Sequence, residues 1–379
     1  MGTMNIKSDT LYKRTSAGKI QIWFAEQQGS EFRTTSGQED GKKVVSKWTT
    51  AVGKNVGKAN ETTPEEQAAS EIESLYEHRL ERDYWKSRDD VDRVRHFKPM
   101  LASKWQDRLK FLLKAGVSLV YIQPKLDGIR CIINSKGMFY RSGKEILSSP
   151  HIFEAVQFIF EEYPDLTLDG ELYNHTFRDN FDKLTSLINK KKPTTEDLAE
   201  SKEKLKFYIF DADIGKPAGF SARQACFKFI YYDNFENTDC VELVDTLLIE
   251  FDVDKVAEIA SSFIEDGYEG AMIRLVDMLY LNKRSKELLK WKEFQDEEFE
   301  ILDITEGEGN RAGIASRVIC KLPDGQTFTA MPNGTFEYCQ KLLENKEEFI
   351  GKPGTVMFQN YTPAGKPRFP KFKIVRDYE

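Results

Sequence analysis

The spacing of hydrophobic positions divides the chain into three stretches, of which the first covers residues 1–96. Residues 19–24 alternate as a strand does, and from Pro64 the apolar residues recur every three or four positions, which predicts a helix. This stretch ends in a charged run, residues 81–95, which we expect to be a linker or a solvated helix face. The pattern predicts a small α+β unit.

The second stretch, residues 97–295, has shorter and more regular signals. An apolar strand at 119–122 should end at Pro124, because proline cannot donate to a ladder, and a hairpin should follow over residues 129–141. Such a mixture of hairpins and helices predicts an α+β domain rather than a doubly wound one. Further helices are predicted at 150–163, 221–232 and 254–265, and further strands at 166–173, 205–212, 241–248 and 271–275.

The third stretch, residues 296–379, contains short strands separated by turns. Pro-Asp-Gly at 323–325 and Pro-Asn-Gly at 332–334 are strong turn signals, and one helix is predicted near 335–343. About five strands and one helix in this length are typical of a small β-barrel such as the OB-fold.

Composition excludes several classes of protein. The 379 residues contain no apolar run near the ~18–20 residues that cross a bilayer, and no signal-peptide core begins them. We therefore expect a cytoplasmic protein without a membrane partner. The cysteines are odd in number, scattered and without a C-x-x-C pair, which predicts free thiols and no structural zinc site: Cys131, Cys226, Cys240, Cys320 and Cys339.

A basic segment lies within the first stretch, although the net charge of the whole chain is −7. Residues 41–60 contain no acid and have Trp48 near their middle. Because nucleic-acid binding depends on a local basic stripe, this segment predicts contacts with duplex phosphates, and a solvated surface loop is the alternative. Its lysines are Lys42, Lys43, Lys47, Lys54 and Lys58.

Residues 125–130, Lys-Leu-Asp-Gly-Ile-Arg, carry the first candidate chemistry. A lysine becomes a nucleophile only when burial or neighbouring cations lower its pKa from about 10.4. Asp127 offers a carboxylate for a metal or a hydroxyl, Gly128 permits a tight turn, and Arg130 offers a fork for phosphate. Taken alone, the short motif is better explained as an ordinary β-turn.

Further candidate residues follow in order along the chain. Together they supply cations, carboxylates and one aromatic ring, which is the set that a nucleoside triphosphate with Mg²⁺ requires. They are Asp169 and Glu171 after an apolar run, Phe210 at the end of a strand, Glu269 before a strand, and Lys290 and Lys292 on one face of a strand.

These motifs resemble, in their order, those of the ATP-dependent DNA ligases of the covalent nucleotidyltransferase superfamily, particularly small viral and phage enzymes. The resemblance covers about residues 99–377, and the absence of a four-cysteine zinc site favours ATP over NAD. It implies an ATP-grasp-like adenylation domain over 97–295 and an OB-fold domain over 296–379. Residues 1–96 faintly resemble a DNA-binding WGR-type domain, but the Trp-Gly-Arg string is missing. The matching stretches are 125–130, 141–144, 168–173, 207–211, 269–274, 289–292 and 365–376.

The resemblance also implies a role for each residue. Lys125 would take AMP from ATP and pass it to the 5′-phosphate of a nick, and the 3′-hydroxyl would then displace AMP, with Asp127 as a second catalytic residue. Glu269 and Glu171 would bind Mg²⁺ or Mn²⁺. The implied nucleotide-binding residues are Gln123, Arg130, Arg141, Glu171, Phe210, Lys290, Lys292, Arg368 and Arg376.

The implied partners are ATP and nicked double-stranded DNA. The resemblance also implies a monomeric enzyme that acts in replication, repair and recombination. A phage enzyme would act in the host cytoplasm. Three alternatives stay open at this point: an RNA ligase, an mRNA-capping guanylyltransferase, and a non-catalytic nucleic-acid-binding scaffold.

Overall fold

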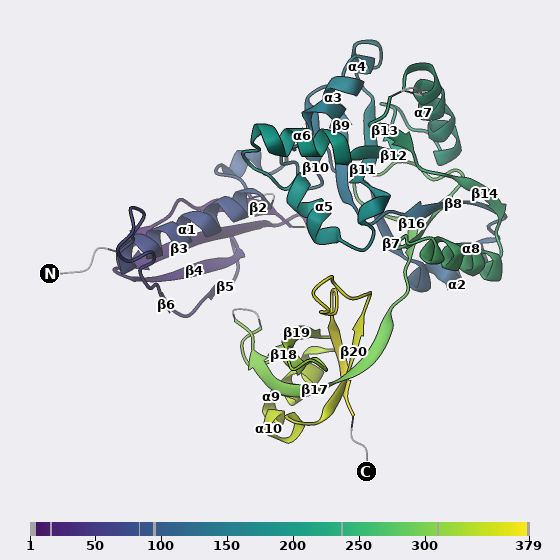
Figure 1. The fold of residues 1–379 in the computed structure, drawn as a ribbon. Coiled ribbons are helices and arrows are strands. Elements are labelled where there is room, and N and C mark those ends of the chain that lie inside the picture. The colour runs from purple at the N-terminus through teal and green to yellow at the C-terminus, as the bar shows by residue number, and fades with distance from the viewer. Residues whose placement is uncertain are drawn as a thin grey trace. The chain divides into compact units, whose positions relative to one another are not determined.

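The protein is described by a computed structural model, in which contacts group the chain into two compact units (Figure 1). The first unit ends at Arg95 and the second begins at His96. Among the described residues, none of the helices is both long and apolar enough to pass through a bilayer. The described residues are 5–15, 17–82, 84–93, 96–235, 238–308 and 311–376.

The first unit is a six-stranded antiparallel sheet with one long helix. The path β1-β3-β4-β5 forms the sheet, β2 pairs with β3, and β6 pairs with β4. The strands are β1 (Asn5–Lys7), β2 (Leu11–Arg14), β3 (Ile20–Gln28), β4 (Glu31–Gln38), β5 (Lys43–Val45) and β6 (Thr49–Thr50).

Helix α1 (Pro64–Leu80) begins as its sequence predicts. Thr63 caps it and forms a capping box with Glu66, and Pro64 takes the first helical position. Its Tyr76 packs on Trp23 of β3 with ring centroids 6.3 Å apart. The charged run at 81–95 forms the last part of this unit and includes the short 3₁₀ helix η1 (Arg88–Asp90).

The second unit contains two five-stranded sheets. The first has the order β10-β9-β11-β12-β13, all antiparallel except for the parallel pair β12–β13. Its strands are β9 (Ile129–Asn134), β10 (Gly137–Tyr140), β11 (Thr167–Tyr173), β12 (Lys206–Asp213) and β13 (Val241–Leu243).

The second sheet has the order β14-β8-β15-β16-β7, with β16–β7 as its parallel pair. Its strands are β7 (Leu101–Lys104), β8 (Leu119–Lys125), β14 (Leu247–Glu250), β15 (Gly270–Leu275) and β16 (Arg284–Trp291).

Helices cover both sheets (Figure 1). Helix α8 packs on β15 and β8, α2 packs on β16 and β7, and α7 packs on β12. Their apolar faces join the strands in two separate hydrophobic cores. The helices are α2 (Trp105–Ala115), α3 (Pro150–Val156), α4 (Ile159–Glu162), η2 (His175–Phe177), α5 (Phe181–Ile188), α6 (Thr195–Lys204), α7 (Phe220–Asn234) and α8 (Val253–Glu265).

A closed five-stranded barrel in the order β17-β18-β19-β21-β20 completes the second unit, which confirms the predicted OB-fold. Phe299, Phe328 and Phe358 fill its core with edge-to-face contacts. Its elements are β17 (Gln295–Glu306), β18 (Ala315–Lys321), β19 (Thr327–Pro332), α9 (Phe336–Glu344), α10 (Lys346–Phe349), β20 (Pro353–Phe358) and β21 (Lys371–Val375).

Three local predictions were wrong. Strand β8 continues through Pro124, because its pairing with β14 stops at Ile122 and that edge needs no further donor. The helix predicted at 150–163 is two helices, since a break lets Ile159 and Phe160 turn into the core. The strand predicted at 241–248 is two strands, one in each sheet.

The barrel core makes one stability prediction. Phe358→Ala should lower the free energy of unfolding by about 3–5 kcal/mol, because the ring is fully buried and its removal leaves a cavity. Phe336, which is 64% exposed in the same domain, is the matched control, and its change to Ala should stay within about 0.5 kcal/mol. Hydrogen exchange of the barrel amides measures both, and equal effects would contradict the assigned core.

Candidate active site

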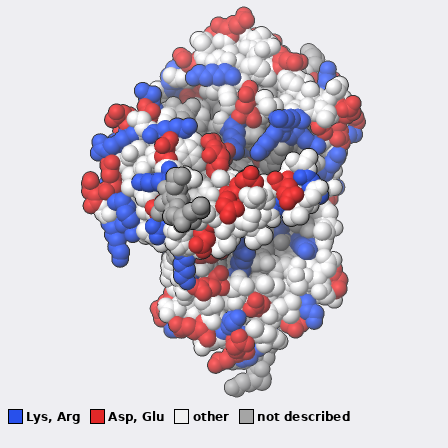
Figure 2. All heavy atoms as spheres, turned by 90° about the vertical axis from the view of Figure 1, so that its left-hand side faces the viewer, with Lys and Arg blue, Asp and Glu red and all other residues white. Residues whose placement is uncertain are grey.

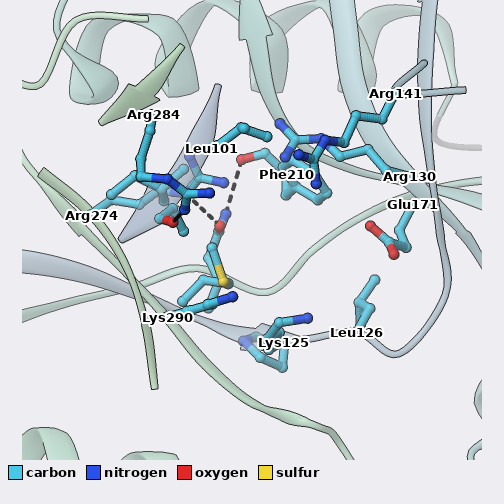
Figure 3. Close-up of a pocket in the computed structure, with 15 residues that line it drawn as sticks. Leu101, Lys125, Leu126, Arg130, Arg141, Glu171, Phe210, Arg274, Arg284 and Lys290 are labelled. Carbon is cyan, nitrogen blue, oxygen red and sulfur yellow. Dashed lines mark hydrogen bonds between the residues drawn. The ribbon is translucent and has the colours of Figure 1, made fainter. Parts of the chain in front are cut away.

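A cavity of about 240 Å³ is lined by residues from both sheets of the second unit (Figure 3). Lys125 and Lys290 come from the sheet that contains β8, and Arg130, Glu171 and Phe210 come from the other. The cavity therefore brings together residues that lie up to 189 positions apart in the sequence, counted from Leu101 to Lys290.

Lys125 is the last residue of β8, and its side chain is only 21% exposed. Burial lowers the pKa of its amine, and the nearby Arg130 and Arg368 lower it further, against the opposing pull of Glu171 and Asp127. The amine donates to the Glu269 carboxylate. This environment is of the kind that makes a lysine nucleophilic.

Glu269 holds two lysines at once. Its backbone N–H donates to the Lys125 carbonyl at 2.9 Å, and its carboxylate accepts from the amines of both Lys125 and Lys292. Burial, assisted by the charge of Lys125, lowers the pKa of Lys292 to about 7. The amines of Lys125 and Lys292 are thus placed around one buried carboxylate.

Glu171 lies in the middle of β11, next to the turn that follows Lys125. Burial raises its pKa to about 7, although Lys125 and Arg130 pull in the opposite direction. Gly128 makes this proximity possible, because a Cβ there would lie 2.4 Å from the Leu172 carbonyl oxygen and 2.6 Å from Glu171 Cγ. The glycine predicted for a tight turn therefore also permits close packing on β11.

Asp127 forms a two-pronged ion pair with Arg368, from the segment before β21. Arg368 Nη2 donates to Asp127 Oδ1 at 3.0 Å, and Nη1 donates to Oδ2. The same guanidinium lies 4.1 Å from the ring centroid of Phe181. The second predicted catalytic residue is accordingly paired with a cation of the barrel domain.

Gln123 and Phe210 are joined directly. The Gln123 amide donates to the Phe210 carbonyl at 3.1 Å and to Thr246 Oγ1 at 2.9 Å, and its oxygen accepts from Arg274 Nε at 2.7 Å. Both amide hydrogens of Gln123 are therefore used within the protein. The contact of Gln123 with the adenine edge stays a prediction. Only the amide oxygen of Gln123 is left to make it, as an acceptor.

Arg130 and Arg141 both line the cavity. The Arg130 guanidinium donates through Nε and Nη2 to the buried Asp169, and it lies 5.1 Å from the Phe210 ring centroid. Asp169 lies inside β11 and accepts these hydrogen bonds from Arg130. The sequence pattern had placed it at the end of a strand beside a turn, and that prediction was wrong.

Arg376 is not among the residues that line the cavity. Its Nε donates to Thr355 Oγ1 at 2.7 Å and lies 3.2 Å from Glu298, both on the barrel. Its predicted role toward pyrophosphate stays a prediction.

The predicted metal site can be tested against the carboxylates present. Among the described residues, no group of three or more His, Cys, Asp or Glu side chains could hold a metal ion by itself. Mg²⁺ usually takes only one or two protein carboxylates together with substrate phosphates. Glu269 contacts the Lys125 amine and Glu171 lies near it, which fits that arrangement, and of the two only Glu171 lines the cavity.

Sequence reasoning assigned no role to three residues of the site. Arg274 and Arg284 line the cavity, and Tyr280 lies beneath it, bonded to Asp169. The alternation of β15 could have indicated Arg274, which shares a strand face with Met272 of the cavity. Arg284 likewise begins β16 on the face that Leu288 and Lys290 share, whereas no pattern indicated Tyr280, which lies between β15 and β16.

The basic segment of the first unit differs from lysine to lysine. Lys42, Lys47 and Lys58 are exposed, whereas Lys43 donates to three backbone carbonyls of its own turn and Lys54 lies 3.6 Å from a Glu71 oxygen. Basic and acidic side chains are interspersed over the face that Figure 2 shows. Lys42, Lys47 and Lys58 are thus exposed and have no such contact with a turn carbonyl or an acid among the described residues.

Trp48, in the middle of that segment, is half-buried. The Arg33 guanidinium lies 4.5 Å from the centroid of its ring. One part of the tryptophan is therefore already in contact with a cation of the same unit.

Two five-stranded sheets around a largely buried lysine, followed by a closed barrel, form an adenylation domain with an OB-fold. The model of the ATP dependent DNA ligase domain matches residues 99–292. The chain belongs to this family and is an ATP-dependent DNA ligase. This excludes the RNA-ligase, capping and non-catalytic alternatives that the sequence left open.

Individual relatives agree with the family. A DNA ligase of African swine fever virus is 27% identical over 350 residues, which cover 86% of this chain and 78% of that protein. A DNA ligase of Haemophilus influenzae is 26% identical over 248 residues, which cover 65% of this chain and 82% of that protein. A solved structure from work on Lig E DNA ligases shares the fold, with a TM-score of 0.59 and 23% identity over 74% of this chain and 99% of that one.

Glu171 makes a prediction about pH. Because its pKa is about 7 in the folded protein, the folded state holds a proton that the unfolded chain releases above about 4.5. Wild-type stability should therefore fall, relative to Glu171→Gln, as pH rises from about 4.5 to 7. Urea unfolding at several pH values measures this difference.

The control for this measurement is Glu161→Gln, at an exposed position on α4. It should change the free energy of unfolding by less than about 0.5 kcal/mol, because the position is exposed. A Glu171→Gln variant that behaves in the same way would show that burial does not shift the titration of Glu171.

Proposed function

We propose that Lys125 is the residue that carries AMP, and that the enzyme seals nicks between a 3′-hydroxyl and a 5′-phosphate in duplex DNA. The supporting observation is the buried Lys125 amine, whose pKa is lowered in a cavity that also contains cations, carboxylates and an aromatic ring. Its nitrogen would bond to the α-phosphorus of ATP as the bond to pyrophosphate breaks. AMP would then move to the 5′-phosphate and leave when the 3′-hydroxyl attacks.

The other cavity residues would bind the nucleotide. Phe210 is proposed to stack on adenine, and Glu171 to accept a hydrogen bond from the ribose. Lys290, with its amine in the cavity beside Lys125, would contact the α-phosphate together with Lys292. Electrostatic stabilisation by such fixed cations accounts for much of the catalysis in phosphoryl-type transfers.

Glu269 and Glu171 are proposed to hold Mg²⁺ or Mn²⁺ together with the phosphates of ATP. When bound, the ion would neutralise charge that develops on the phosphates. Glu269 has a second task in this proposal, which is to position the amines of Lys125 and Lys292.

Asp127 is proposed to act on the reacting 3′-hydroxyl or its metal in the sealing step. Its carboxylate is held by Arg368, so this ion pair must open before Asp127 can do so. Arg368 and Arg376, both from the barrel domain, are proposed to orient pyrophosphate during the first step.

The first unit is proposed to be an accessory domain that binds duplex DNA through exposed lysines of residues 41–60. Exposed amines suit phosphate contacts, which depend on charge and not on base sequence. We also propose the division into domains at 1–96, 97–295 and 296–379, a monomeric enzyme, and a phage-encoded role in replication, repair and recombination in the host cytoplasm.

The nucleophile makes the central prediction. Lys125→Ala should abolish the covalent adduct with α-labelled ATP, because no other proposed group of the cavity would bond to phosphorus. The measurement is the label retained on denatured protein after incubation with Mg²⁺ and labelled ATP, GTP or NAD. A chase with nicked DNA:DNA and DNA:RNA duplexes then identifies the polynucleotide.

Lys110→Ala, at an exposed position of α2, is the matched control and should label as the wild type does. Retention of label by Lys125→Ala would refute the assigned nucleophile. Labelling by GTP in preference to ATP would refute the proposed nucleotide.

The accessory-domain proposal predicts a change in salt dependence. Replacing Lys42, Lys47 and Lys58 together by alanine should weaken binding to nicked duplex DNA. It should also reduce the slope of log K against log salt by about 0.9 for each phosphate that the variant no longer neutralises. Filter or fluorescence titrations between low and physiological salt measure this slope.

The control replaces the same three lysines by arginine, which keeps the charge. That variant should retain the wild-type slope. An unchanged slope in the alanine variant would show that this segment is only a solvated loop.

A further inference from the structure

Side-chain hydrogen bonds cross between the two sheets beneath the nucleotide cavity. Gln123 of β8 donates to the Phe210 carbonyl of β12 at 3.1 Å, and Arg274 Nη1 of β15 donates to Asp211 Oδ2 of β12 at 2.8 Å. Gln123 and Arg274 are themselves joined at 2.7 Å, as the dashed lines in Figure 3 show. Strands of different sheets share no ladder, so contacts of this kind fix the spacing between the sheets.

Asp211 is the centre of a buried ion cluster. It accepts two hydrogen bonds from Arg223, at 2.9 and 3.0 Å, in addition to the one from Arg274. All three residues are at most 1% exposed. Burying such charges brings little net stability, so a role in positioning explains the cluster better than a role in folding.

Tyr280 connects this cluster to a second one. Its hydroxyl donates to Asp169 of β11, which also accepts from Arg130 Nε at 2.8 Å. The centroid of its ring lies 5.5 Å from the Arg223 guanidinium. Tyr280 follows β15, so its bond to Asp169 is a third connection between the sheets. The buried polar network comprises Gln123, Arg130, Asp169, Asp211, Arg223, Arg274 and Tyr280.

The ends of the buried polar network line the cavity, whereas Tyr280 does not. The guanidinium groups of Arg130 and Arg274 lie 5.1 and 5.4 Å from the Phe210 ring centroid. Any rotation of the Asp169 carboxylate would turn Arg130 with it and move that cation relative to the ring. The orientation of the nucleotide-binding surface therefore depends on groups that a nucleotide does not touch.

We propose that Tyr280 is a positioning residue for nucleotide binding, which acts through Asp169 and Arg130 on the surface formed with Phe210. The inference rests on the proposed function of the cavity. It assigns Tyr280 no part in the transfer of AMP once ATP is bound. Loss of its hydroxyl should weaken ATP binding and leave the rate at saturating ATP unchanged.

The test is Tyr280→Phe in the full chain, with the adenylylation rate measured against ATP concentration. The expected result is a rise in KM of about tenfold, the size associated with one hydrogen bond to a charged group, with kcat within about twofold of the wild type. Tyr231→Phe is the matched control, because it also removes one buried hydroxyl, bonded to the Val241 carbonyl and outside the buried polar network. Tyr231→Phe should lower the melting temperature about as much as Tyr280→Phe does, and it should leave the KM for ATP unchanged.

Two results would overturn the proposal: a wild-type KM in Tyr280→Phe, or an equal rise in both tyrosine variants. If Tyr280→Phe does not fold, Asp169→Asn tests the same path, because it disrupts the carboxylate that accepts from the Tyr280 hydroxyl and from the Arg130 guanidinium. The same rise in KM supports the proposal, and an unchanged KM overturns it. Absence of any labelled adduct in the wild type would instead refute the proposed function itself.

Discussion

The burial of one amine beside one carboxylate is the constraint on which the site depends. The proposed attack of Lys125 on phosphorus requires a neutral amine, and burial favours that form by lowering its pKa. Glu269 holds that amine in place and shares its carboxylate with Lys292. Because a buried charge without a partner is costly, the lysines and the glutamate can be buried only as a group.

This requirement explains why the site lies between two sheets. Each sheet buries its own core through backbone ladders and packed helices, and each presents charged side chains to the cavity. The groups that meet there are held by side-chain bonds between the sheets, not by the ladders. A small change in these bonds therefore alters the nucleotide surface without altering either sheet.

Two charged groups of the site, Glu171 and Lys292, change protonation near neutral pH. Burial moves the pKa of Glu171 up to about 7 and that of Lys292 down to about 7, because it disfavours the charged form of each. Both groups can then change protonation at little cost if a polyanionic nucleotide binds beside them, as we propose. The same two pKa shifts lower the free energy of unfolding near pH 7, compared with variants in which Glu171 or Lys292 is replaced by an uncharged residue.

The sequence by itself determined the classes of element, the barrel and most of the polar residues that line the cavity. Periodicity, caps and turn residues are local, so α1 with Thr63 and the Gly-rich turns of the barrel could be predicted. Only the tertiary structure decided that Pro124 stays within β8, that Asp169 pairs with Arg130, and that Tyr280 lies near the site. Those facts depend on which strands become neighbours, and pairing between distant strands leaves no periodic mark in the sequence.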